Sequence, residues 1–126
     1  MLLAEDNDLN AELATILLED SEMIVTHAAD GQEVVDLFAN HPAGTYDIIL
    51  MDIMMPKMNG LQAAKAIRAM QAERPDAEEI PIIALSANAF AEDVQTSLDA
   101  GMNGHISKPL NVAEVAKVIA RNLNKS

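Results

Sequence analysis

Charged and hydroxyl side chains stand where four short apolar runs of the sequence end. They are Glu5, Asp6, Asp52, Ser86 and Lys108. Carboxylates gathered in one place repel one another, so they favour a cation between them. Carboxylate oxygens, backbone carbonyls and waters are the ligands that Mg²⁺ takes in proteins. A carboxylate nucleophile, a divalent ion, a lysine and a hydroxyl together form a set suited to phosphoryl transfer.

These side chains can act together only if the elements before them form one sheet. Apolar runs predict five strands, at residues 1–4, 23–28, 47–52, 80–85 and 105–107. Helical spacing between the runs predicts five helices, the first over residues 8–20. The helices are marked by Leu9, Leu13, Ile16 and Leu17; by Val34, Val35 and Phe38; by Leu61, Ala64 and Ile67; by Phe90, Val94 and Leu98; and by Val112, Val115, Ile119 and Leu123.

Two further sequence features indicate where the fourth helix ends and where the last helix begins. Gly101 is expected to end the fourth helix as the residue just beyond it. Asn111, with Glu114 three residues later, resembles a capping box for the last helix. Strict alternation of strands and helices predicts an α/β fold with an open, doubly wound parallel sheet. In such sheets function collects at the carboxyl ends of the strands, where the polar residues stand.

Composition narrows the class of protein. A chain of 126 residues suits one domain, and we expect residues 1–126 to form it. The net charge of −12 and the eight scattered basic residues argue against direct binding of nucleic acid. There is no cysteine, so neither a disulfide nor a thiolate metal site can form. The apolar runs are too short for membrane insertion, and no secretory signal opens the chain. We therefore expect the protein to be located in the cytoplasm.

Four segments carry a resemblance to a known family. They are residues 4–7 (AEDN), 51–60 (MDIMMPKMNG), 85–89 (LSANA) and 108–109 (KP). Together they resemble the receiver domain of response regulators in two-component signalling. Residues 87–93 and 100–102 are similar to receivers of hybrid sensor histidine kinases in particular. The family has a flavodoxin-like (βα)5 fold with strand order 2-1-3-4-5. The abrupt first strand suits a receiver cut from a longer hybrid kinase chain.

The resemblance implies a role for each matching residue. Asp52 is implied as the phosphoacceptor. Glu5, Asp6, Asp52 and the backbone carbonyl of Met54 are implied to hold Mg²⁺, with Mn²⁺ as a substitute. The donor is expected to be the phosphohistidine of a histidine kinase or a histidine phosphotransfer domain. The domain then assists its own phosphorylation and dephosphorylation but is not a turnover enzyme.

Three further residues are implied to respond to the phosphoryl group. Lys108 is expected to pair with it, and Ser86 is expected to act as the switch hydroxyl. Most of the family carries an aromatic residue where this chain has His105. Histidine can make a similar movement, and its charge can change near neutral pH. A half-buried strand histidine without a switching role explains His105 equally well at this stage.

Three other functions are alternatives to that of a receiver. A phosphatase of the haloacid dehalogenase type has a second Asp two residues after the first, where this chain has Met54. A degenerate receiver that only binds partners would lack members of the set formed by Asp6, Asp52, Ser86 and Lys108, and all four are present. A flavin-binding protein of the same topology would need a hydroxyl-rich phosphate loop after the first strand, and none is present.

The first helix carries two apolar stripes on opposite faces. We expect Leu9, Leu13, Ile16 and Leu17 to pack on the sheet, since they are large and recur at helical spacing. Ala11, Ala14 and Leu18 then fall on the outer face, where small residues around one leucine would let a partner helix dock. Incidental exposure and contact with a neighbouring segment are the alternatives.

Overall fold

The structure is a computed structural model that describes residues 1–20, 24–41, 46, 48–53, 58–72, 76–86, 95–96, 98–107 and 112–123. Five parallel strands form one sheet in the order β2-β1-β3-β4-β5. Their bounds are Leu2–Ala4 (β1), Thr26–Ala28 (β2), Ile49–Asp52 (β3), Ile82–Ser86 (β4) and Gly104–Ser107 (β5). The predicted α/β class and the flavodoxin-like strand order are confirmed.

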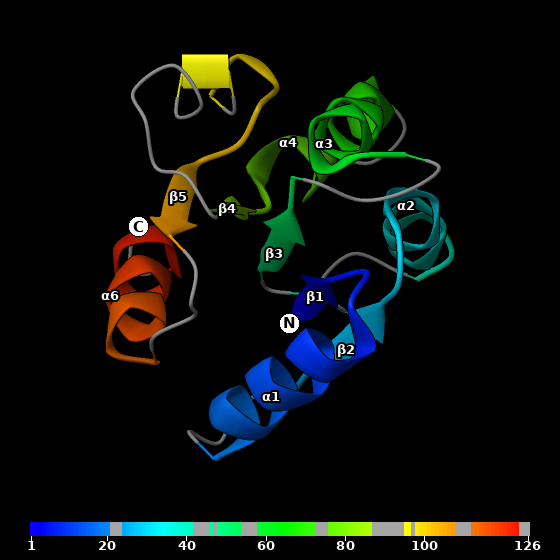
Figure 1. The fold of residues 1–126 in the computed structure, drawn as a ribbon. Coiled ribbons are helices and arrows are strands. Elements are labelled where there is room, and N and C mark those ends of the chain that lie inside the picture. Colours follow the sequence, from blue (N-terminus) through cyan, green and yellow to red (C-terminus); the bar gives the residue numbers. More distant parts are fainter. Residues whose placement is uncertain are drawn as a thin grey trace.

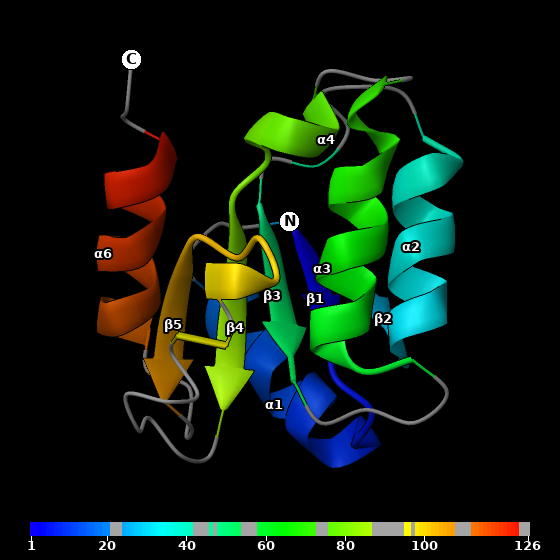
Figure 2. The same cartoon turned by 90° about the horizontal axis from the view of Figure 1, so that it is seen from above.

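Helices cover both faces of this sheet, as Figure 1 shows. The helices are α1 (Asp8–Glu19), α2 (Gly31–Ala39), α3 (Gly60–Arg68), α4 (Asp76–Glu79) and α6 (Val112–Leu123), and a 3-10 turn, η1 (Ala69–Ala72), extends α3. In Figures 1 and 2, α1 and α6 lie on one face, while α2, α3 and α4 lie on the other. No helix in the described residues is long and apolar enough to cross a membrane.

Two predicted features fall wholly or partly outside the described residues. The fourth predicted helix is described only at Gln95, Thr96, Leu98 and Asp99, which are helical. The predicted capping box of α6 begins at Asn111, which is not described. Gly101 does end the fourth helical segment with a φ of 98°, the left-handed conformation that favours glycine at this place. The short helix α4 was not predicted, because four residues are too few to show a helical period.

The core consists of two layers, one on each face of the sheet. Alternate strand residues enter alternate layers, so Leu2, Ile49 and Ile82 pack towards α2 and α3. Leu3, Leu50 and Ile83 pack towards α1 and α6. All six are fully buried. Burial on both faces explains why the strands read as continuous apolar runs.

Polar caps start three helices at one edge of the sheet. Each helix follows a strand and begins with a side-chain oxygen that accepts a backbone N–H of the first turn. The cap pairs are Asn7 with Asn10 (2.9 Å), Asp30 with Glu33 (2.8 Å) and Asn59 with Gln62 (2.9 Å). In turn, the side-chain oxygen of Gln62 accepts the backbone N–H of Asn59 at 3.1 Å, which completes a capping box for α3. The helix starts therefore surround the carboxyl ends of the strands.

At the other edge, Arg68 joins three segments. Its Nε donates to the carbonyl of Gly101 at 2.9 Å, and its Nη1 donates to the carbonyl of Ala77 at 3.0 Å. Its Nη2 donates to Oδ1 of Asn103 at 2.6 Å, and this oxygen also accepts the N–H of Ile82 at 2.9 Å. One guanidinium thus holds the end of α3, α4 and the approaches to β4 and β5 together.

The orientation predicted for α1 is wrong. Ala11 and Leu18 are buried, and Ala14 packs against the same core layer. The large residues face solvent instead: Leu9, Leu13, Ile16 and Leu17 are 63, 53, 51 and 41 % exposed. Small residues let the helix approach the sheet closely, and Leu18 fills the space near its end. The stripe formed by Ala11, Ala14 and Leu18 therefore cannot be a docking surface.

This orientation of α1 predicts opposite results for two leucines. We expect Leu18→Ala to lower the free energy of unfolding by about 2–5 kcal/mol, the usual loss for a buried leucine. The matched change Leu13→Ala should alter it by about 0.5 kcal/mol or less, because Leu13 already contacts water. Urea unfolding followed by circular dichroism measures both values. Equal losses would contradict the observed orientation of the helix.

Candidate functional site

Three carboxylates meet at the carboxyl ends of the two central strands. The strands β1 and β3 pair with Ala4 opposite Met51, so Glu5 and Asp52 follow at neighbouring positions. Asp6 comes next to Glu5 in the chain. One carboxylate oxygen from each of Glu5, Asp6 and Asp52 lies within 4.8 Å of the other two. The predicted meeting of these three residues is thus observed.

Two members of this cluster are withdrawn from water. Glu5 is 4 % exposed and Asp52 is 3 % exposed, whereas Asp6 is exposed. A buried carboxylate that keeps its charge needs hydrogen bonds or an opposite charge. The backbone N–H of Asn7 donates to Oε1 of Glu5 at 3.3 Å. The exposed carboxylate of Asp6 lets a cation reach this cluster from solvent.

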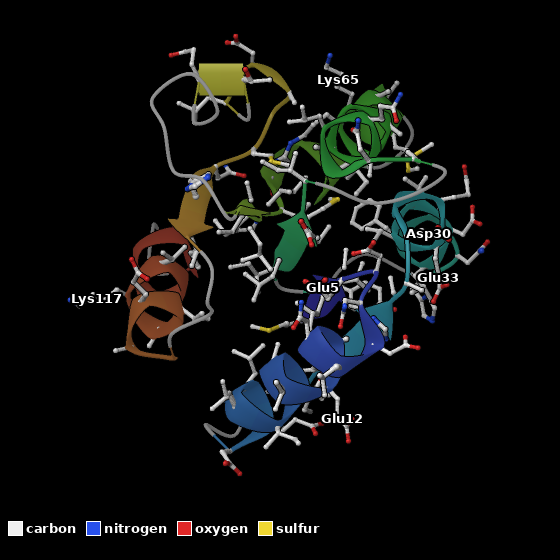
Figure 3. All side chains as sticks on the ribbon, viewed as in Figure 1. Glu5, Glu12, Asp30, Glu33, Lys65 and Lys117 are labelled. Atoms are coloured by element: carbon white, nitrogen blue, oxygen red, sulfur yellow. The ribbon has the colours of Figure 1, made fainter. Side chains whose placement is uncertain are left out.

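The backbone of Glu5 is fixed from the edge strand β2. Its N–H donates to the carbonyl of Ala28 at 3.0 Å, and its carbonyl lies 2.7 Å from Nε2 of His27. A carbonyl can only accept, so Nε2 of His27 carries the proton in this bond. Figure 3 labels Glu5 at the end of β1. These bonds hold the main chain of Glu5 while its side chain enters the cluster. No local sequence pattern indicates the His27 contact, because it depends on how β1 and β2 pair.

The backbone of Asp52 is fixed from the other side. The next residue, Ile53, donates its N–H to the carbonyl of Leu85 in β4 at 3.2 Å. The carbonyl of Ile53 accepts the N–H of Gly60, the first residue of α3, at 3.0 Å. Asp52 therefore ends a strand whose continuation is attached both to a neighbouring strand and to a helix. The position of the Asp52 backbone is thus fixed from two sides.

The remaining predicted residues are described in part. Ser86 ends β4, and its backbone pairs with Ser107, one position beyond the pair formed by Asp52 and Leu85. Its backbone therefore lies at the same edge as the carboxylates, while its side chain is outside the described part. Met54 and Lys108 are also outside the described residues. Their roles as metal ligand and phosphoryl partner stay predictions.

His105 has an unusual environment. It pairs with Ala84 in β4, and its Nε2 is buried with no hydrogen-bond partner among the described residues. A buried polar atom left without a partner costs roughly 1–3 kcal/mol.

The donor set fits Mg²⁺. Three carboxylates supply only hard oxygen ligands, as this ion prefers, and neither sulfur nor imidazole is part of the cluster. The exposed position of Asp6 leaves one side open to water, and Mg²⁺ keeps several waters in most protein sites.

Comparison with known proteins decides the family. The model of the response regulator receiver domain matches residues 1–120 of the chain. The chain belongs to the receiver domain family. Curated relatives of this receiver include hybrid signal transduction histidine kinase I of Dictyostelium discoideum, 37 % identical over 121 residues. They also include the sensor protein GacS of Pseudomonas syringae, 36 % identical over 121 residues. The matches cover 94 % and 96 % of the receiver but only 7 % and 13 % of those two proteins.

Solved structures support the same family. The receiver domain of a sensor histidine kinase from Pseudomonas aeruginosa is 35 % identical, with a TM-score of 0.85 and coverage of 98 % and 96 % of the two chains. That structure has a magnesium ion coordinated in its active-site cleft. The receiver domain of Saccharomyces cerevisiae Ssk1, crystallised with the histidine phosphotransfer protein Ypd1, gives 28 % identity and a TM-score of 0.85 over 96 % and 86 % of the chains. Together with the carboxylate cluster, these likenesses support a Mg²⁺ site in the present receiver.

Removal of one carboxylate should weaken this site. We expect Asp6→Ala to bind Mg²⁺ roughly 10–100-fold more weakly than the parent, the loss typical when a metal site is disturbed. Asp8→Ala is the matched control, because Asp8 is exposed two residues further on, in the first turn of α1. Isothermal titration with Mg²⁺ measures both affinities. Equal affinities for Asp6→Ala and the parent would remove Asp6 from the metal site.

Proposed function

We propose that this domain accepts a phosphoryl group on Asp52 from a phosphohistidine of a histidine kinase or a histidine phosphotransfer protein. It acts as a signalling module and not as a turnover enzyme. The observation that carries the proposal is the cluster of Glu5, Asp6 and Asp52, with its carboxylate oxygens within 4.8 Å, in a chain of the receiver family. Because the receiver spans only a small part of its curated relatives, the activity of any longer chain is a separate question.

The transfer is a displacement at phosphorus. A carboxylate oxygen of Asp52 attacks, the P–N bond to the donor imidazole breaks, and the departing nitrogen takes up a proton from solvent. The product is an acyl phosphate. When bound, Mg²⁺, or Mn²⁺ in its place, would supply positive charge that stabilises the negative charge of the phosphoryl group during transfer. Glu5 and Asp6 would hold it together with Asp52 and the backbone carbonyl of Met54.

Two side chains are proposed to bind the transferred group. Lys108 would pair with one phosphoryl oxygen as a point charge. Ser86 would donate its hydroxyl to another. The position of Ser86 supports this role, because its backbone ends β4 beside the end of β3. These contacts form only in the phosphorylated state, so they favour one of two conformations of the domain.

His105 is proposed to follow that change. Residues two apart on a strand share a face, so Ser86 and Ala84 lie on one side of β4. His105 pairs with Ala84 and is therefore a diagonal neighbour of Ser86 in the adjacent strand. Its buried, unpartnered Nε2 supports a ring that gains a partner when it moves.

The outer α1 face, formed by Leu9, Leu13, Ile16 and Leu17, is proposed as the surface that docks the donor. These four exposed residues replace the stripe that the sequence predicted. The helix begins two residues after Asp6, so a partner lying along it reaches the carboxylate cluster at one end. Exposed acidic residues Asp8, Glu12, Glu19 and Asp20 border this face, and Figure 3 labels Glu12 on the side of α1 away from the sheet. A helical phosphohistidine protein with an apolar centre and a basic rim fits this surface.

The phosphoacceptor can be tested directly. With acetyl phosphate and Mg²⁺, the parent should gain one phosphoryl group that hydroxylamine removes, as expected of an acyl phosphate. Asp52→Asn should gain none, because an amide cannot serve as the nucleophile. Intact-protein mass spectrometry measures the added mass. Stoichiometric labelling of Asp52→Asn would contradict the proposed function.

The docking surface needs a different readout. Leu13→Glu should slow phosphotransfer from a phosphorylated histidine phosphotransfer protein at least about tenfold, since loss of a hot-spot residue at the centre of an interface costs about 2 kcal/mol or more. Labelling by acetyl phosphate should keep its parental rate. Leu98→Glu is the matched control, because Leu98 is also a half-exposed leucine. Its helical segment lies on the face of the sheet opposite α1, as the yellow ribbon in Figure 1 shows. Parental phosphotransfer in Leu13→Glu would exclude the outer α1 face as the docking site.

A further inference from the structure

Helix α2 rests on the segment that follows the phosphoacceptor strand, at a point where only glycine fits. The N–H of Gly31, the first residue of α2, donates to the carbonyl of Met58 at 3.0 Å. A Cβ on Gly31 would lie 2.1 Å from that same oxygen and 2.8 Å from its carbon. The backbone of Gly31 is outside the left-handed region, so space and not conformation requires the glycine.

A second contact of the same kind lies two residues further along the chain. Gly60 begins α3, and a Cβ there would lie 2.4 Å from the carbonyl oxygen of Asp52 and 3.0 Å from Cα of Ile53. Both glycines are buried. The contact of Gly31 with Met58 and the contact of Gly60 with Asp52 thus connect α2 to the phosphoacceptor through backbone atoms alone.

Hydrogen bonds fix the starts of α2 and α3 and the residue after β3, which carry these contacts. Asp30 caps the first turn of α2, and the capping box of Asn59 and Gln62 fixes the first turn of α3. Figure 2 shows α2 and α3 side by side, and they share one core layer. On the other side, the N–H of Ile53 is bonded to β4. A close-packed interior transmits a displacement of one element to the next, because it has little free volume to absorb it.

We propose that Gly31 is a positioning residue for Asp52. The close approach of α2 to Met58 sets the place of the segment after β3, and through Gly60 it sets the place of the Asp52 carboxylate relative to Glu5 and Asp6. This inference rests on the proposed function, because the quantity that it governs is the metal affinity of that carboxylate cluster. Gly31 touches neither the metal nor the phosphoryl group.

A purely structural role for Gly31 makes a different prediction. If the glycine only lets α2 pack against α3, its replacement lowers stability and leaves the metal site as it was. Gly101 provides a matched control for this case. A Cβ on Gly101 would lie 2.8 Å from Cγ of Arg68, at the opposite edge of the sheet, and its φ of 98° adds strain. Gly101→Ala therefore damages the fold without approaching the carboxylates.

The experiment compares Mg²⁺ affinity in the parent, Gly31→Ala and Gly101→Ala at a temperature where all three are folded. We expect Gly31→Ala to bind Mg²⁺ roughly tenfold more weakly, the low end of the 10–100-fold loss seen when a group that orients a metal ligand is changed. Its labelling by acetyl phosphate should slow at subsaturating Mg²⁺. Gly101→Ala should keep the parental affinity. Parental affinity in Gly31→Ala would overturn the proposal.

Hydrogen exchange of the parent tests the same proposal if Gly31→Ala does not fold. Coupling between two sites is reciprocal, so if the Gly31 contact favours metal binding, bound Mg²⁺ must favour the contact. Mg²⁺ should therefore slow exchange of the Gly31 amide more than that of Asn103, which donates to the carbonyl of Ile82 at the opposite edge. Equal slowing would overturn the positioning role. A parent that binds no Mg²⁺ would instead contradict the proposed function.

Discussion

Repulsion among Glu5, Asp6 and Asp52 is the constraint that the rest of this structure answers. Three carboxylates within 4.8 Å of one another would separate if their backbones were free to move. They are not free, because two of them end adjacent parallel strands whose pairing is fixed by a ladder of backbone bonds. The strand pairing thus keeps the carboxylates close together, and their repulsion favours binding of a cation between them. The affinity for metal is a property of the sheet as much as of the side chains.

The two ends of the strands have different roles in the structure. At the edge with the carboxylates, capped helix starts and the tight contacts of Gly31 and Gly60 fix the backbone. At the other edge, Arg68 joins α3, α4 and the approaches to β4 and β5 through side-chain bonds. The Arg68 hydrogen bonds and the two core layers stabilise the fold. This stability offsets the cost of bringing three carboxylates together at the carboxyl ends of the strands. Such separation lets the site keep an unfavourable charge arrangement in a stable fold.

The sequence predicted those features that depend on local pattern. Alternating apolar runs and helical periods predicted the parallel sheet, and the residues ending the runs predicted the carboxylate cluster. The orientation of α1 was not predictable in the same way. A helical period separates two stripes but does not say which one faces the sheet, and here the small Ala11 and Ala14 pack inward while Leu13 and Ile16 face water. Contacts such as that of Gly31 with Met58 depend on the placement of two helices, which no local pattern contains.

The fold holds three carboxylates together at a cost in stability that a divalent cation relieves. The most direct measurement is the free energy of unfolding of the parent and of Asp52→Asn, with and without Mg²⁺. In metal-free buffer the variant should be at least as stable as the parent, because one repelling charge is gone. Above the dissociation constant, each tenfold increase in Mg²⁺ should stabilise the parent by about 1.4 kcal/mol and the variant much less. A parent whose stability does not change with Mg²⁺ would contradict the account.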